Sequence, residues 1–140
     1  MKISIIMPAY NAEKTINAAI KSVIGQTFPN WELLIINDCS TDKTKEIISE
    51  WLNCDQRIGL IENPQNLGVA QTRNQGVAHA RGEWVAFLDS DDLWKPDKLE
   101  MQIKWVKKFH ARLVFTGSAF IDEDGREIDY YLNVPQKLSF

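Results

Sequence analysis

Short apolar runs alternate with segments of helical spacing along most of this sequence, and this alternation constrains the fold more than any other feature. The runs at 33–36 and 84–88 are continuously apolar, which is typical of strands covered on both faces. Between such runs, apolar residues recur every three or four positions, as in Ile16, Ile20 and Val23, which favours helices with one buried face. The pattern predicts a three-layer α/β/α domain with a mainly parallel sheet.

Local features set the expected bounds of these elements. The predicted strands are 3–7, 31–36, 58–61, 84–88 and 113–115. Pro8 is expected to end the first strand, and Asn11 to cap the first helix. On a helix from Val69 to Ala80, the expected buried face is Val69, Ala70, Val77 and Ala78. Asp124-Gly125 between apolar flanks predicts a hairpin turn.

Composition bounds the class of protein. The 140 residues suit one compact domain over 1–140, and a hydrophobic fraction of 44% is enough for a sizeable core. Sixteen basic and 19 acidic side chains give a formal net charge of −3, which does not support a nucleic-acid binder. The segment 132–140 contains Pro135 and no closing element, so we expect the domain to be cut short at its C-terminus.

The first apolar run is too short for a signal peptide, and no stretch is long enough to cross a bilayer. Two cysteines, Cys39 and Cys54, fit a reducing compartment better than a disulfide framework. We therefore expect a cytoplasmic protein, and leave open a peripheral association with the inner face of the membrane.

Polar residues follow the first, second and fourth predicted strands directly. In open parallel sheets, ligands bind beyond the carboxyl ends of the strands, so these residues are the site candidates. The candidates in these clusters, with the apolar residues beside them, are Pro8, Ala9, Tyr10, Asn11, Asn37, Asp38, Ser40, Asp42, Asp89, Asp91 and Asp92. An aromatic ring can stack on a base, and a carboxylate can accept a hydrogen bond from a base or a ribose. Together they predict a site for a nucleotide diphosphate.

The usual phosphate-binding loops are missing from the sequence, which has neither a P-loop nor G-x-G-x-x-G after the first strand. The phosphate charge would then be offset by a metal ion and by a cationic side chain, for which Arg73 is the candidate. Arg73 could equally form an ion pair with a local carboxylate. Because its helical neighbours are small or apolar, we expect it to point inward, where an arginine needs an anion.

Three carboxylates arrive within four positions after the fourth strand. Asp89, Asp91 and Asp92 repel one another and are costly to desolvate, which indicates a cation at this place. In an extended segment, Asp89 and Asp91 would point to the same side of the chain. That arrangement would hold one hard divalent ion and leave positions for phosphate oxygens. The alternative is a solvated loop in which Asp92 caps a turn.

In four segments the sequence resembles glycosyltransferase family 2, whose members have the GT-A fold. The segments are Met7–Asn11, Ile36–Asp42, Asn66–Gly76 and Gly82–Asp92, in the order of the family. The resemblance implies that Pro8, Ala9 and Tyr10 wall the nucleotide pocket, with Asn11 beside them. It also implies that Asp38 bonds the base, most often uracil. Asn37 and Cys39 stand where Asp and Gly are commoner in the family.

The same resemblance assigns the phosphate and metal groups. Arg73 would contact the ribose or the phosphates of the nucleotide. Asp89-Ser90-Asp91 is similar to the D-x-D element of the family. Asp89 and Asp91 would therefore bind Mn²⁺ or Mg²⁺, with Asp91 the direct ligand and Ser90 counted among the donor contacts.

The implied activity is transfer of a sugar from a nucleotide-diphosphate donor, expected to be a UDP-sugar, to an acceptor hydroxyl with inversion. The acceptor would be a saccharide or a lipid-linked molecule, and the setting envelope or capsule polysaccharide synthesis. No segment matches the catalytic-base motif of the family, so the base is expected beyond Phe140. Asp122, Glu123 and Asp124 are expected to be solvated turn residues. A non-catalytic nucleotide-binding module and a phosphatase of the Asp-x-Asp type stay open as alternatives.

Overall fold

The structure is a computed structural model that describes residues 1–122 and 126–128. The chain divides into two compact units, Met1–Lys104 and Trp105–Phe140. The first unit contains β1 (Ile3–Ala9), α1 (Ile16–Ile24), β2 (Trp31–Asn37), α2 (Thr44–Cys54), β3 (Ile58–Glu62), α3 (Val69–His79) and β4 (Trp84–Phe87). Helix α4 (Lys98–Phe109) begins in the first unit and ends in the second, which also contains β5 (Phe120–Ile121) and β6 (Glu127–Ile128).

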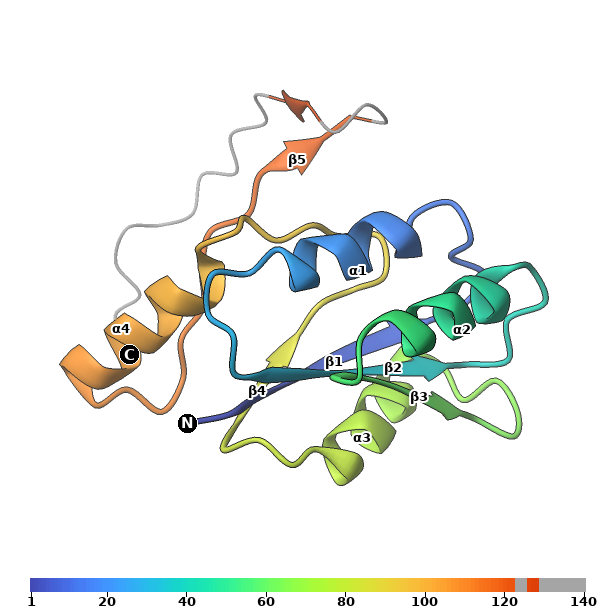
Figure 1. The fold of residues 1–140 in the computed structure, drawn as a ribbon, viewed down its shortest axis with the longest axis horizontal. Helices are drawn as coiled ribbons and strands as arrows, with labels where there is room; N and C mark the ends of the chain where they lie inside the picture. The colour runs from blue at the N-terminus through green and yellow to red at the C-terminus, as the bar shows by residue number, and fades with distance from the viewer. Residues whose placement is uncertain (123–125, 129–140) are drawn as a thin grey trace. The chain divides into compact units, whose positions relative to one another are not determined.

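The first unit is built on a four-stranded sheet of order β3-β2-β1-β4. All of its pairings are parallel, with Ile5 of β1 level with Leu33 on one side and Ala86 on the other. Helices α1 and α2 lie on one face of this sheet and α3 on the opposite face (Figure 1). The predicted three-layer α/β/α arrangement with a parallel sheet is confirmed.

The main core lies between the sheet and the face that carries α1 and α2. Ile5 and Leu33 from the strands and Ile20 and Ile48 from the helices are fully buried there. Leu99 and Ile103 of α4 complete this core.

The buried face of α3 differs from the prediction. Val69 and Val77 are 54% and 43% exposed, whereas Thr72 and Gly76 are buried. A Cβ at Gly76 would lie 2.7 Å from Ile36 Cδ1 and still closer to Ile6 Cγ2. The helix therefore approaches the sheet through its small residues, because larger side chains on that face would push it away.

The apolar sequence of strand β4 predicted that it would be covered on both faces, but one of its faces is open. Val85 and Phe87 are 38% and 51% exposed. Their register places them level with Ser4 and Ile6, on the side of the sheet that α3 covers. However, α3 packs on β1 and β2, so this face of the edge strand β4 stays open to solvent.

Two boundaries near the N-terminus also differ from the prediction. Strand β1 continues through Pro8 to Ala9. Pro8 has no backbone N–H to donate, and this is tolerated because the neighbouring strand β4 ends level with Ile6. Helix α1 begins at Ile16 with Thr15 as its N-cap residue, and Asn11 does not cap it. The Asn11 side chain bonds to a different loop, described below.

In the second unit, the predicted strand at 113–115 is absent, and Leu113 and Phe115 are 81% and 80% exposed. A hairpin does form, since β5 and β6 pair antiparallel and Asp122 N donates to Arg126 O. The predicted turn residues Asp124-Gly125 lie outside the described residues, as does Glu123. Among the described residues, no helix is long and apolar enough to span a membrane.

Candidate functional site

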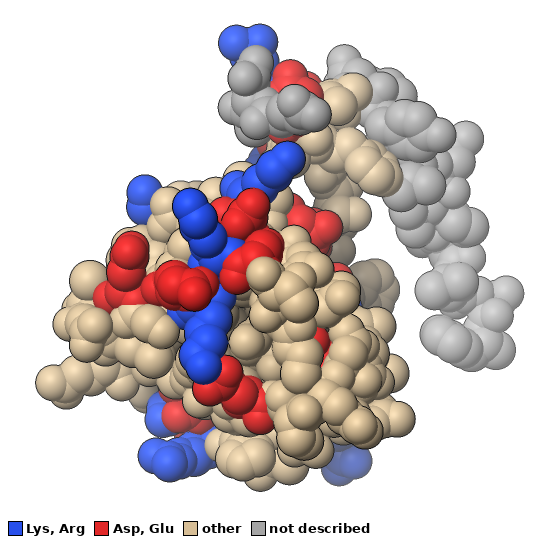
Figure 2. Space-filling model, turned by 90° about the vertical axis from the view of Figure 1, so that its right-hand side faces the viewer, with Lys and Arg blue, Asp and Glu red and all other residues tan. Residues whose placement is uncertain are grey.

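The strands of the parallel sheet end at one edge, which we call the carboxyl-end edge: residues 9–13, 37–44, 62–73 and 88–92. Figure 2 looks onto the side of the molecule where β1, β2 and β3 end, and shows acidic and basic side chains lying next to one another across it. Short hydrogen bonds join the loops at this edge, so they form a continuous rim.

Asn11 ties the loop after β1 to the loop after β2. Its Oδ1 accepts a hydrogen bond from Thr41 N at 2.8 Å, and its own N–H donates to Ser40 Oγ at 3.0 Å. The backbone of Asn11 is left-handed, with φ 49°, a conformation that asparagine tolerates better than most residues. The Asn11 side chain, which was expected to contact the nucleotide, therefore holds the two loops of the rim together.

The remaining residues of the predicted nucleotide wall differ in exposure. Pro8 and Ala9 are buried within β1, and the Ala9 carbonyl accepts a hydrogen bond from Asp38 N at 2.8 Å. Tyr10 is 53% exposed. Of these three residues, Tyr10 is the one whose side chain is open to a ligand.

Asp38 is 3% exposed and fixes the approach to α3. Its Oδ1 accepts from Asn63 Nδ2 and Leu67 N at 2.8 Å each, and its Oδ2 accepts from Gly68 N at 2.9 Å. Burial alone would raise the pKa of Asp38. The hydrogen bonds from Leu67, Asn63, Gly68 and Thr72 outweigh it, so the pKa lies below its ordinary value.

Asn63 and Thr72, which support this carboxylate, were not predicted as site residues. Asn63 Nδ2 also donates to Thr72 Oγ1 at 3.0 Å, so both belong to the same buried network. The useful sequence feature was the position of Asn63 directly after the third strand, at the same edge as the other candidates.

Arg73 and Asp89 form an ion pair. Arg73 lies in the second turn of α3, and its Nη2 is 2.5 Å from Asp89 Oδ1. The two side chains are 35% and 43% exposed. Arg73 Nε is buried and has no hydrogen-bond partner in the part of the chain that the structure describes. An ion pair with a carboxylate, the alternative predicted for Arg73, is present here, and the contact of Arg73 with a nucleotide stays a prediction.

The segment from Asp89 to Asp92 is a turn and not the extended segment that the sequence had suggested. Asp92 N donates to Asp89 O at 3.1 Å, which leaves Ser90 and Asp91 at the centre of the turn. Asp91 is exposed and Ser90 half-buried. Asp89 and Asp91 therefore lie on a tight turn, and they do not share one side of an extended segment.

The chemistry of this turn fits a hard divalent cation. Partial desolvation and the charges of Asp91 and Asp89 raise the pKa of the Asp92 carboxyl above its ordinary value, so negative charge here is incompletely compensated. Carboxylate oxygens are the ligands that Mg²⁺ and Mn²⁺ prefer. Within 1–122 and 126–128, however, no group of three or more His, Cys, Asp or Glu residues is assembled around a metal position.

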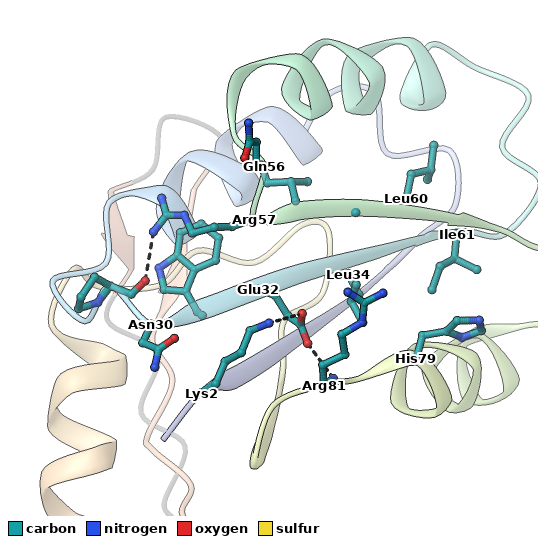
Figure 3. Close-up of a pocket in the computed structure, with 14 residues that line it drawn as sticks. Lys2, Asn30, Glu32, Leu34, Gln56, Arg57, Leu60, Ile61, His79 and Arg81 are labelled. Atoms are coloured by element: carbon teal, nitrogen blue, oxygen red, sulfur yellow. Dashed lines mark hydrogen bonds and ion pairs between the residues drawn. The ribbon is translucent and has the colours of Figure 1, made fainter.

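A cavity of about 540 Å³ lies at the opposite, amino-terminal end of the sheet (Figure 3). Glu32 is buried there and accepts hydrogen bonds from Lys2 Nζ, Ser4 Oγ and Arg81 N. Burial would raise the pKa of Glu32, but these donors lower it below its ordinary value. None of the predicted site residues lines this cavity, so we place the candidate site at the carboxyl-end edge.

Comparison with curated proteins identifies close relatives. The putative teichuronic acid biosynthesis glycosyltransferase TuaG of Bacillus subtilis is 39% identical over 99% of this chain and 55% of its own length. The UDP-Glc:alpha-D-GlcNAc-diphosphoundecaprenol beta-1,3-glucosyltransferase WfgD of Escherichia coli is 42% identical over 99% of this chain and 53% of its own length. The chain thus spans about half the length of these relatives.

Solved structures give the same picture. TarS of S. aureus in complex with UDP-GlcNAc has a TM-score of 0.74 and 34% identity, covering 79% of this chain and 32% of TarS. The mannosyltransferase PcManGT of Pyrobaculum calidifontis, in complex with GDP-Man and Mn²⁺, has a TM-score of 0.71 and 28% identity, over 75% of this chain and 32% of that one. The family model described as Glycosyl transferase family 2 matches residues 4–139. The chain belongs to glycosyltransferase family 2 and has the GT-A type of α/β fold.

Proposed function

We propose that this chain is the donor-binding part of an inverting, metal-dependent glycosyltransferase that uses a UDP-sugar. The identity to TarS, whose structures hold UDP and UDP-GlcNAc, supports the uridine nucleotide. The names of TuaG and WfgD support a role in assembling an envelope or capsule polysaccharide on a saccharide or lipid-linked acceptor. The proposed place of work is the cytoplasm, at the inner face of the membrane.

The observation that carries this proposal is the gathering of one exposed ring, one buried carboxylate and one arginine–aspartate pair at the carboxyl-end edge. Tyr10, Asp38, Arg73 and Asp89 come from four separate segments of the sequence and lie at one edge because the parallel strands end there, with Arg73 and Asp89 in contact. This is the edge at which open α/β sheets bind ligands.

On this proposal, the nucleotide lies against Pro8, Ala9 and Tyr10, with the Tyr10 ring available to stack on the base. Asp38 Oδ2 accepts a hydrogen bond from Gly68 N, so a base N–H would share this oxygen with the backbone. Asn11 then acts by holding the rim beside the base.

The charged residues would hold the diphosphate. Arg73 offers a guanidinium fork to its oxygens, and Asp89 and Asp91 offer carboxylates to Mn²⁺ or Mg²⁺, with Ser90 between them. A divalent ion bound there would supply electrostatic stabilisation of the departing diphosphate. PcManGT, whose structure contains Mn²⁺ and GDP-Man, supports this use of a cation. We assign no catalytic base within the chain.

Ligand-dependent melting tests this proposal. Saturating UDP with Mn²⁺ should raise the melting temperature by several degrees, since ligand at 100 times its Kd adds about 2.7 kcal/mol of stability. Asp91→Ala should remove the Mn²⁺-dependent part of the shift and keep the rest. The matched control is Glu50→Ala, which removes an exposed acid on α2 and should leave the shift unchanged. A melting curve unaffected by saturating UDP and Mn²⁺ would count against the proposal.

A non-catalytic nucleotide-binding module is the second candidate, because no catalytic base can be assigned among these residues. The two candidates differ in one measurement. A transferase should slowly hydrolyse a UDP-sugar in the presence of Mn²⁺ and release UDP, whereas a binding module should show the melting shift without hydrolysis. The phosphatase alternative is not retained, because the chain belongs to a glycosyltransferase family.

A further inference from the structure

Asp89, one of the two proposed ligands of the metal ion, is already paired with a cationic side chain, that of Arg73. Arg73 Nη2 lies 2.5 Å from its Oδ1, and both side chains are about half-buried. The Arg73 guanidinium is a cation, so a positive charge lies next to the Asp89 carboxylate. Because the pair is partly shielded from solvent, salt screens it less than it would screen an exposed pair.

A divalent cation that approaches Asp89 therefore meets a positive charge as well as a carboxylate. Repulsion between the two cations at a few Å opposes binding. The other acids offer no preformed ligand set, because Asp91 is exposed on the turn and no group of three or more ligands exists in the described ranges. With the site in this state, the protein should bind a divalent cation weakly on its own.

Arg73 has an unsatisfied donor of its own. Its Nε is buried, yet no atom of the described residues accepts a hydrogen bond from it. A buried donor without a partner is costly, and a ligand oxygen would remove that cost. Phosphate oxygens suit the guanidinium fork because they can accept two parallel hydrogen bonds. A diphosphate can therefore compete with Asp89 for Arg73.

We propose that Arg73 makes the binding of a divalent cation and of a nucleoside diphosphate mutually dependent. Arg73 covers Asp89 when neither ligand is bound. It turns to the diphosphate when both bind, which leaves Asp89 to the cation. This inference rests on the proposed function, since it takes Asp89 and Asp91 as cation ligands. Linkage requires that each ligand raise the affinity of the other by the same factor.

The test measures Mn²⁺ binding to the 140-residue chain from the electron paramagnetic resonance signal of free Mn²⁺, with and without UDP. A titration without protein corrects for Mn²⁺ held by UDP in solution. Without UDP, Arg73→Gln should bind Mn²⁺ roughly 5- to 10-fold more tightly than the unaltered chain, because Asp89 is uncovered. The factor by which UDP then improves Mn²⁺ binding should be smaller in Arg73→Gln, and UDP itself should bind more weakly.

Arg57→Gln is the matched control. It removes an arginine–aspartate ion pair of the same kind, Arg57 with Asp55, at the other end of the sheet. Its Mn²⁺ and UDP binding should equal those of the unaltered chain. Should Arg73→Gln fail to fold by circular dichroism, Arg73→Lys replaces it. Arg73→Lys keeps the charge beside Asp89 and should keep weak Mn²⁺ binding, while losing part of the gain from UDP.

Two negative results are distinguishable. If Mn²⁺ binds the unaltered chain with UDP, but Arg73→Gln without UDP binds Mn²⁺ no more tightly than that chain, the inference about Arg73 is wrong and the proposed function stands. If Arg73→Lys is used, the inference is wrong when UDP improves the Mn²⁺ binding of this variant as much as that of the unaltered chain. If Mn²⁺ does not bind the unaltered chain even with saturating UDP, the metal site itself is wrong, and the inference fails with it.

Discussion

At the scale of single residues, Asp38 is a buried carboxylate that several hydrogen bonds hold in place. Its carboxylate accepts two backbone N–H groups, from Leu67 and Gly68, and one amide from Asn63, while being 3% exposed. An asparagine would turn an NH₂ group toward one of these donors. Since hydrogen bonds to a charged group contribute about 1.5–3 kcal/mol, Asp38→Asn should lower the free energy of unfolding by about 2–3 kcal/mol.

Urea denaturation at pH 7 measures this change. Glu50→Gln is the isosteric control, because Glu50 is exposed on α2 and its side chain accepts no hydrogen bond within the described residues. Equal stability of the two variants would show that the buried carboxylate is not what holds the start of α3.

The lowered pKa of Asp38 also predicts a pH dependence. Its ordinary value is 3.8 and its value in the folded chain is lower, so the unfolded state binds the proton first as the pH falls. The contribution of Asp38 is therefore complete above about pH 5 and is lost as the pH falls through its folded value, below 3.8. Between pH 6 and pH 3, the stability of Asp38→Asn should fall less steeply than that of the unaltered chain. Parallel slopes would contradict the assignment.

Residue types at strand ends could be predicted from the sequence, but their partners could not. Asp38, Arg73 and Asp89 were identified because polar residues after buried strands must meet at one edge. Which donor satisfies which acceptor depends on loop conformation, such as the left-handed backbone at Asn11 and Gly68. Spacing alone therefore left the role of Arg73 open between a phosphate contact and an ion pair.

At the scale of elements, α3 shows how packing distance decides a helix face. Gly76 lies against Ile6 and Ile36, and a Cβ there would come within 2.7 Å of Ile36 Cδ1. Gly76→Ala would gain up to about 1 kcal/mol in helix propensity, but overpacking costs about 1–3 kcal/mol. We expect a net loss of stability in urea denaturation and weaker UDP binding, since the helix that carries Arg73 must move.

Asn74→Ala on the same helix is the control for this prediction. Asn74 is exposed, so the variant should gain the propensity of alanine without a clash and be as stable as the unaltered chain or slightly more so. If Gly76→Ala were also stabilised, the close packing of α3 on the sheet would be wrong.

Element type was easier to predict than element surroundings. The periods of α1 and α2 and the runs of β1 to β3 were enough to find those elements, because each buries a regular pattern. The predicted buried face of α3 was wrong because it was chosen by hydrophobicity, which favours large residues, whereas close contact between a helix and a sheet favours small ones. The predicted strand at 113–115 was wrong because a short apolar run does not show whether a neighbouring strand exists to pair with it.

At the scale of the whole molecule, the order of the layers followed from the alternation of strands and helices, because parallel strands need crossover helices. The division into two units did not follow from it. The single domain over 1–140 stays a prediction. Composition changes little near Lys104, so the sequence offered no boundary there. What distinguishes the two units is core membership, which depends on which side chains meet in space.

Core membership leads to a prediction about truncation. The residues of the main core cluster all lie between Ile3 and Ile103, and the described residues from 115 to 122 and from 126 to 128 are exposed. A chain ending at Thr116 should therefore unfold cooperatively, within a few degrees of the full chain by differential scanning calorimetry, and keep its UDP and Mn²⁺ shift. A chain ending at Asp97 removes Leu99 and Ile103 from the core and should lose about 2–5 kcal/mol for each large side chain, enough to unfold a domain of ordinary stability. Loss of the transition in the chain ending at Thr116 would show that the second unit supports the sheet.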